Sequence, residues 1–182
     1  MNATVARPQT RYRLSLRELR QRWEQLADDP LVAAIPFKVE LNEKGVIEVS
    51  PPTTQHAFLQ AFVTSELKRQ RPEGTTFTEC PVETEIGMRV PDVVWASAEF
   101  MERHSGEKQF RAAPDLCVEI LSPRNTRAEM AEKIAAYLTA GAQEIWIVGD
   151  DGVADIHTGA CRVPASTLKF RLPRPRVSAP RD

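Results

Sequence analysis

The pattern of apolar and polar residues predicts helices and strands along most of the 182-residue chain. Apolar residues recur near helical spacing in residues 13–26, 54–69 and 126–141, and a proline or glycine ends or follows each stretch. Short apolar or alternating runs predict strands over residues 37–40, 46–49, 76–80, 82–86, 90–96, 116–121, 144–148 and 153–157. Taken in order, these elements indicate an α/β (α+β mixed) fold.

The connections between these elements suggest how the chain is divided. The first two predicted strands flank a turn that ends in Gly45, which predicts a β-hairpin after the N-terminal helix. Residues 99–113 are largely polar and predict a loop. The last segment has four prolines and little apolar periodicity. We expect an N-terminal helical extension at 1–36, one domain at 37–163 and a basic, Pro-rich tail at 164–182.

Charge is distributed unevenly, although the net charge of the whole chain is only −1. Residues 1–22 contain six arginines and one acid, and residues 162–182 contain six bases and one acid. The residues between them contain 12 bases and 23 acids. Basic ends around an acidic middle fit a protein that contacts a nucleic-acid backbone and binds cations, but solvated tails explain the ends equally well.

Other features of composition narrow the class of protein. No apolar stretch approaches the roughly 18 residues that span a bilayer, so we expect a cytoplasmic protein without a membrane segment. The three cysteines, Cys80, Cys117 and Cys161, are too widely spaced for a disulfide framework or a zinc pair. We expect reduced and mostly buried thiols.

Two acidic residues lie within strongly apolar strand-like runs. Asp92 lies in the run at 90–95 and Glu119 in the run at 116–121. An unpaired ionised carboxylate in a sheet interior costs several kcal/mol, so a positive charge must compensate each one. If the two strands are neighbours, the carboxylates can approach one divalent cation. The pattern therefore predicts a metal site suited to hydrolysis.

Two further residues are candidates for this site. Lys133 lies at the margin of the apolar face of its helix, where its ammonium group could reach the strand ends. An exposed lysine paired with Glu129 is the alternative for Lys133. Glu40, in the predicted hairpin, is a candidate accessory ligand, although outward-facing polar alternation also explains it.

Several other polar residues have ordinary explanations. His56 follows a proline pair at a helix start, where we expect capping or surface exposure. Glu83 and Glu85 alternate with apolar residues, which predicts the solvent face of an edge strand. Asp115 most simply begins a strand, and support of the metal site is its alternative role.

Three segments together resemble one family of nucleases. They are Pro91-Asp92-Val93-Val94, the segment from Pro114 to Pro123 with the sequence PDLCVEILSP, and the segment from Glu132 to Gly141 followed by the strand at 144–148. The chain resembles the Uma-type putative restriction endonuclease family, a branch of the PD-(D/E)XK nuclease superfamily. The resemblance covers residues 37–151.

The resemblance implies a restriction-endonuclease-like core with a central mixed β-sheet flanked by helices. It implies that Asp92 and Glu119 ligate Mg²⁺, for which Mn²⁺ substitutes, and that Glu40 matches an additional upstream acid. The usual lysine, two residues after the second acid, is absent because Leu121 stands there. In this family the lysine is displaced to the following helix, where Lys133 occupies its place.

The leading hypothesis is therefore a Mg²⁺-dependent endonuclease that hydrolyses DNA through Asp92, Glu119, Lys133 and Glu40. We expect no organic cofactor, and a homodimer because double-strand cleavage requires two sites or a repositioning step. Two alternatives remain open. The domain could be a noncatalytic module that binds DNA or a protein partner, or Glu119 could simply pair with Lys133 in an inert domain.

Overall fold

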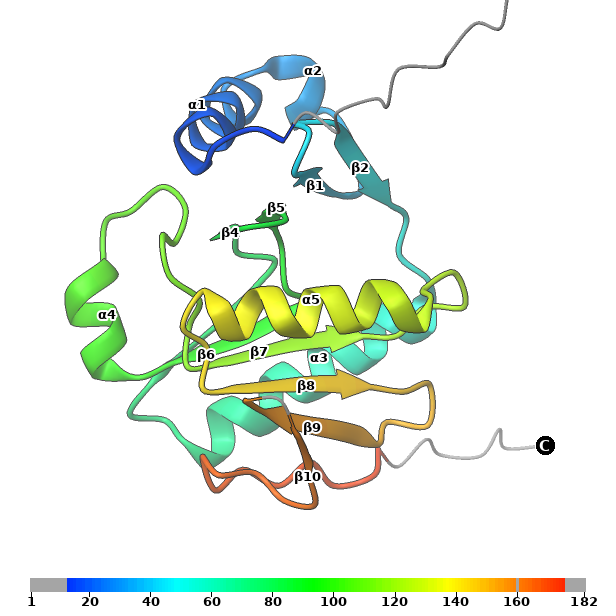
Figure 1. Cartoon of the computed structure of the whole chain (residues 1–182). Helices are drawn as coiled ribbons and strands as arrows, with labels where there is room; N and C mark the ends of the chain where they lie inside the picture. Colours follow the sequence, from blue (N-terminus) through cyan, green and yellow to red (C-terminus); the bar gives the residue numbers. More distant parts are fainter. Residues whose placement is uncertain (1–12, 160, 176–182) are drawn as a thin grey trace, which may run out of the picture.

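The computed structural model describes residues 13–159 and 161–175. It contains five helices and ten strands in these described residues (Figure 1). In chain order they are α1 (Leu16–Ala27), α2 (Pro30–Ala33), β1 (Lys38–Asn42), β2 (Ile47–Ser50), α3 (Thr54–Gln70), β3 (Thr75–Thr78), β4 (Val82–Thr84), β5 (Gly87–Arg89), β6 (Val93–Ala96), α4 (Ala98–His104), β7 (Leu116–Ile120), α5 (Arg127–Thr139), β8 (Glu144–Val148), β9 (Ala154–Thr158) and β10 (Cys161–Val163).

The larger of two sheets has six strands in the order β10-β9-β8-β7-β6-β3. Strands β7 and β8 are parallel and are joined through α5, whereas the other neighbours are antiparallel. Helix α5 lies on one face of this sheet and α3 on the other (Figure 1). The expected mixed α/β fold with a central mixed sheet flanked by helices is confirmed.

Strand alternation divides the core between the two faces of this sheet. Leu116, Val118 and Ile120 pack with α3, whereas Cys117 packs with α5. Because successive side chains point to opposite faces, Glu119 lies on the α5 face. This alternation brings Glu119 under the helix that carries Lys133.

The smaller sheet has four strands in the order β2-β1-β5-β4. Helix α1 packs against it through Leu19, which is fully buried, and Arg20 forms a two-point ion pair with Glu83 at 2.8 and 2.9 Å. The expectation that Glu83 faces solvent is therefore wrong, because α1 covers that face of β4. Glu85, in the turn that follows, is exposed.

Two predicted segments have a different structure. The single strand predicted at 82–86 is shorter and forms a hairpin with β5, which begins at Gly87. A Cβ atom at Gly87 would lie 1.9 Å from the carbonyl oxygen of Leu41, and the glycine φ is +125°, so only glycine fits this turn. The predicted loop at 99–113 begins inside α4, which Ser97 caps.

The segment after β10 packs against the larger sheet. Phe170 is buried and makes edge-to-face contacts with Trp95 and Trp146 at centroid distances of 5.3 and 6.1 Å.

The division of the chain at residues 36 and 163 stays a prediction. The cysteines are free thiols, of which Cys117 is buried and Cys161 exposed. Within residues 13–159 and 161–175, no helix is long and apolar enough to cross a membrane.

Candidate functional site

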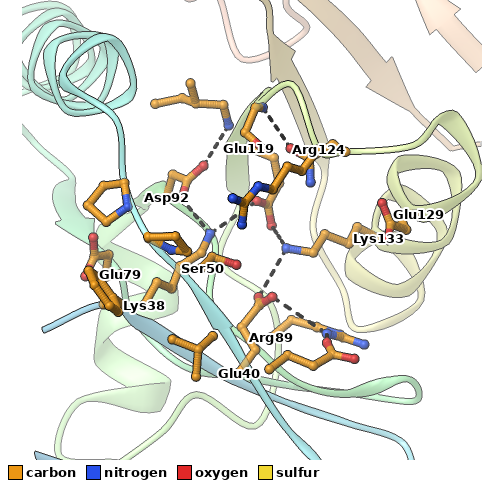
Figure 2. Close-up of a pocket in the computed structure, with 18 of the residues that line it drawn as sticks. Lys38, Glu40, Ser50, Glu79, Arg89, Asp92, Glu119, Arg124, Glu129 and Lys133 are labelled. Atoms are coloured by element: carbon orange, nitrogen blue, oxygen red, sulfur yellow. Dashed lines mark hydrogen bonds and ion pairs between the residues drawn. The ribbon is translucent and has the colours of Figure 1, made fainter. Parts of the chain in front are cut away.

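A pocket of about 740 Å³ lies where the smaller sheet meets the end of the larger one. Strand β1 contributes Lys38 and Glu40, β5 contributes Arg89, and β7 contributes Glu119. Asp92 lies in the short connection between β5 and β6, and Lys133 projects from α5 (Figure 2). The four candidate residues predicted from the sequence therefore meet in one place.

The backbone and two side chains hold the Asp92 carboxylate. Oδ2 accepts a hydrogen bond from the Ile120 N–H at 2.7 Å, which anchors Asp92 to β7. Val93 pairs with Val118, so the next step in this antiparallel register places Asp92 beside Glu119. Oδ1 accepts a hydrogen bond from Lys38 Nζ at 2.6 Å and lies 3.3 Å from His56 Nε2.

The Glu119 carboxylate has a different partner on each oxygen. Oε1 accepts hydrogen bonds from the Tyr137 hydroxyl at 2.7 Å and from Lys133 Nζ at 3.0 Å. Oε2 faces Lys38 Nζ at 3.6 Å. Tyr137 and Lys133 are four residues apart on α5, so one face of the helix supplies both donors.

Lys133 connects Glu119 to Glu40. Its Nζ lies 3.2 Å from Glu40 Oε1, and its side chain is only 13% exposed. Glu40 Oε1 also accepts a hydrogen bond from the Val90 N–H at 2.7 Å, and Arg89 lies 3.6 Å from Oε2. Lys133 is thus a largely buried lysine paired with Glu119 and Glu40, rather than an exposed one paired with Glu129.

The surrounding charges keep these groups ionised. Burial raises the pKa of Asp92, but the His56 hydrogen bond and the Lys38 charge lower it to about 2. Burial likewise opposes ionisation of Glu40, and Lys133, Lys38 and Arg89 reverse that effect so that its pKa is lowered. At neutral pH the pocket therefore combines ionised carboxylates with ammonium groups.

The pKa of Tyr137 is raised well above its ordinary value, first by burial and then by the Glu119 charge. The phenol is therefore protonated, and it remains a hydrogen-bond donor to Glu119. The pKa of Lys133 is also raised, because Glu119 and Glu40 outweigh the opposing effect of burial. Lys133 stays charged.

Sequence reasoning missed four residues of this site: Lys38, His56, Arg89 and Tyr137. The expectation for His56 is wrong, because Thr53 caps α3 and the His56 imidazole points at Asp92. Tyr137 lies four residues after Lys133, and this helical spacing could have identified it. The signal available for Arg89 was its closeness to Asp92 in the chain. Lys38 shares a strand face with Glu40, which was the available signal for it.

The oxygen atoms of Asp92 and Glu119 suit a hard divalent cation. Lys38 Nζ lies within 4 Å of both carboxylates, so the two groups already converge on one positive charge. In the part of the chain that the structure describes, no group of three or more His, Cys, Asp or Glu side chains could hold a metal ion. Two carboxylates still fit Mg²⁺, which retains waters and binds substrate phosphates.

The chain has a nuclease-like fold with a charged pocket at the end of its larger sheet. A family model, Uma2, described as "Putative restriction endonuclease", matches residues 20–175. The chain belongs to this family. The match extends beyond residues 37–151 in both directions and includes most of α1.

Two solved structures are similar to the chain. The first is the crystal structure of a putative nuclease belonging to DUF820 from Anabaena variabilis. It has a TM-score of 0.55 and 25% identity, over 68% of this chain and 73% of the other. The second, a cryoEM structure of a DrdV–DNA complex, has a TM-score of 0.36 and 17% identity, over 82% of this chain and 12% of the other. The second similarity is too low to define a shared fold. No curated protein matches the chain.

Proposed function

We propose that this protein is a Mg²⁺-dependent endonuclease that hydrolyses phosphodiester bonds of DNA. One observation carries the proposal: Asp92, directly before β6, and Glu119, on the neighbouring strand β7, both contact the Lys38 ammonium inside an open pocket, with Lys133 beside Glu119. Membership of a family described as "Putative restriction endonuclease" and similarity to the structure of a protein described as a "putative nuclease" support the same function.

Asp92 and Glu119 would hold the metal ion. A bound Mg²⁺ or Mn²⁺ ion supplies an activated water and polarises a phosphoryl oxygen. The Ile120 N–H fixes one Asp92 oxygen and leaves the other facing the pocket. The Tyr137 hydroxyl similarly fixes Glu119 Oε1 and leaves Oε2 on the side of Asp92.

Lys133 would act on the phosphate. Its ammonium is charged, largely buried and aimed into the pocket, so it can donate to a non-bridging phosphate oxygen and neutralise charge that develops there. Glu40 contacts Lys133 and Arg89, which makes it a positioning residue for the ammonium.

Cleavage of DNA by the purified full chain tests this function. Supercoiled plasmid and short duplexes are incubated with Mg²⁺, Mn²⁺ or EDTA, and the products are separated by electrophoresis. We expect nicking or cutting with either metal and none with EDTA. An Asp92→Ala variant that cleaves DNA at the wild-type rate would contradict the proposed function.

A noncatalytic module that binds DNA or a protein partner is the second candidate. The observation that favours it is Lys38, which already compensates Asp92 without a metal ion. A Mn²⁺ titration discriminates the two functions, because an endonuclease of this kind requires a saturable metal site and a binding module does not.

Double-strand cleavage by a one-site domain requires two sites or a repositioning step, and we propose that a homodimer supplies the two sites. The mass of the full chain in solution, measured by light scattering with and without a short duplex, tests this assembly. A monomer in both samples would contradict it.

A further inference from the structure

Lys38 occupies the space between the two proposed metal ligands. Its Nζ lies 2.6 Å from Asp92 Oδ1 and 3.6 Å from Glu119 Oε2, and its side chain is 12% exposed (Figure 2). Lys38 therefore contacts one oxygen of each carboxylate. Its ammonium therefore stands where a bridging cation would be held.

Two cations cannot share this position. Mg²⁺ binds carboxylate oxygens at about 2.1 Å, so an ion between Asp92 and Glu119 would lie against the Lys38 ammonium. Like charges at such a distance repel strongly in a partly buried site. Metal entry therefore requires the ammonium to withdraw, and the flexible four-carbon stem of lysine allows this movement into the pocket.

Lys133 is placed differently, although it is equally buried. Its Nζ contacts Glu119 Oε1 and Glu40 Oε1, whereas Lys38 faces the other oxygen of Glu119, Oε2. Lys38 contacts Asp92 Oδ1 and Glu119 Oε2. A cation between those oxygens displaces Lys38 and leaves the contacts of Lys133 in place.

We propose that Lys38 is a built-in counter-ion of Asp92 and Glu119 that competes with the metal ion for one position and so sets the metal affinity of the site. This inference rests on the proposed metal-dependent function. Without metal, Lys38 compensates two buried carboxylates that would otherwise lack a shared positive charge. With metal, the divalent ion takes over that compensation.

The test is Mn²⁺ binding by calorimetry at fixed pH and ionic strength, with the full chain and four variants. Lys38→Met removes the charge and keeps the stem, Lys38→Gln keeps a donor for Asp92 without charge, and Lys38→Arg keeps the charge. Lys133→Met is the matched control, because it removes an equally buried ammonium that contacts the other oxygen of Glu119.

We expect Lys38→Met and Lys38→Gln to bind Mn²⁺ roughly tenfold tighter or more than the wild type, because the competing charge is gone. Lys38→Arg should bind as weakly as the wild type, and Lys133→Met should gain clearly less than Lys38→Met. Thermal unfolding gives a second readout: metal-free Lys38→Met should melt below the wild type and gain more from Mn²⁺.

The outcomes separate this inference from the function on which it rests. Saturable binding to the wild type with no gain in the uncharged Lys38 variants would overturn the role of Lys38 and leave the metal site standing. An equal gain in Lys133→Met, or a gain in Lys38→Arg, would also overturn it. The absence of a saturable site in every variant would overturn the proposed function and this inference together.

Discussion

The two ends of strands β7 and β8 both bury carboxylates, but they hold them in different ways. At one end Glu144 is fully buried and accepts hydrogen bonds from Trp146 Nε1 at 2.5 Å and from Thr167 N and Oγ1 at 2.7 and 2.9 Å. Asp115 accepts from Ser97 N and Gln143 Nε2 at 2.7 and 2.5 Å. At the other end, lysines approach Asp92 and Glu119 in an open pocket.

The two ends differ in whether another group can replace the hydrogen-bond or ion-pair partners of the carboxylates. The carboxylates of Glu144 and Asp115 accept hydrogen bonds from neutral donors that the backbone and packed side chains hold in place. These acids therefore stabilise the fold. Ammonium groups on flexible stems compensate Asp92 and Glu119, and we propose that a divalent cation replaces that of Lys38. Burial alone therefore does not mark a functional carboxylate, and we propose that burial beside an exchangeable charge in a cavity does. Asp115 belongs to the first group.

The largest expected effect comes from a substitution of Glu119, at the end of β7 that lines the pocket. Glu119→Gln keeps the shape but removes the charge that would hold the metal, so we expect DNA cleavage to fall by roughly 10³-fold, the upper end for loss of one electrostatic contact in a site. The measurement is the nicking rate of supercoiled plasmid at saturating Mg²⁺. If the variant cleaves within a few-fold of the wild-type rate, Glu119 does not have the proposed role in the site.

The next effect concerns the lysine on α5. Lys133→Met should lower the cleavage rate on the order of 10²-fold, because the phosphate loses a buried cationic donor. The loss should fall on kcat in a steady-state assay with a short duplex. Lys68, an exposed lysine on α3, is the matched control, and Lys68→Met should leave the rate unchanged. Equal losses in the two variants would indicate a nonspecific effect of charge on DNA binding.

The opposite end of the strands should respond in stability rather than in activity. Glu144→Gln weakens hydrogen bonds from Trp146 and Thr167 to a charged acceptor, so we expect a loss of roughly 3 kcal/mol in the free energy of unfolding. Urea unfolding measures the loss. The cleavage rate per folded molecule should be unchanged, and a large fall in that rate would erase the distinction between the two ends.

A smaller effect concerns pH and Asp92. Its pKa is about 2 in the folded protein against an ordinary value of 3.8, so its stabilising contribution is present above the ordinary value and is lost as pH falls through 2. Asp92→Asn lacks this titration. The difference in the free energy of unfolding between the wild type and Asp92→Asn should shrink by about 2 kcal/mol between about pH 5 and pH 2. A difference independent of pH would mean that Asp92 is not held by the charges around it.

Much of the fold could be predicted because its signals are local. Helix α5 begins with the capping box of Thr126 and Glu129, and the structure contains both of its hydrogen bonds. Helix α4 was missed because it is short and buries only Phe100, which leaves no apolar stripe. The turn at Gly87 depends on the approach of Leu41 from another strand, which no local pattern records.

Sequence patterns could identify those site residues that break a local rule, namely the usual placement of apolar and charged residues in a strand or helix. Asp92 and Glu119 are charges in apolar, strand-like runs of the sequence, and Lys133 lies at the edge of an apolar helix face. Lys38 breaks no such rule, since a lysine in a hairpin strand ordinarily faces water. Its position follows from the packing of the smaller sheet against the larger one, which is a tertiary feature. The roles of Asp92, Glu119, Lys133 and Glu40 stay predictions until they are tested.

The most direct test of the central claim is the position of a metal ion in crystals of the full chain grown with Mn²⁺, located by anomalous scattering. We predict an anomalous peak between Asp92 and Glu119, with the Lys38 ammonium displaced from the position between them. A crystal saturated with Mn²⁺ that shows no peak there, with Lys38 still bound to both carboxylates, would contradict the assignment of these two acids as a metal site.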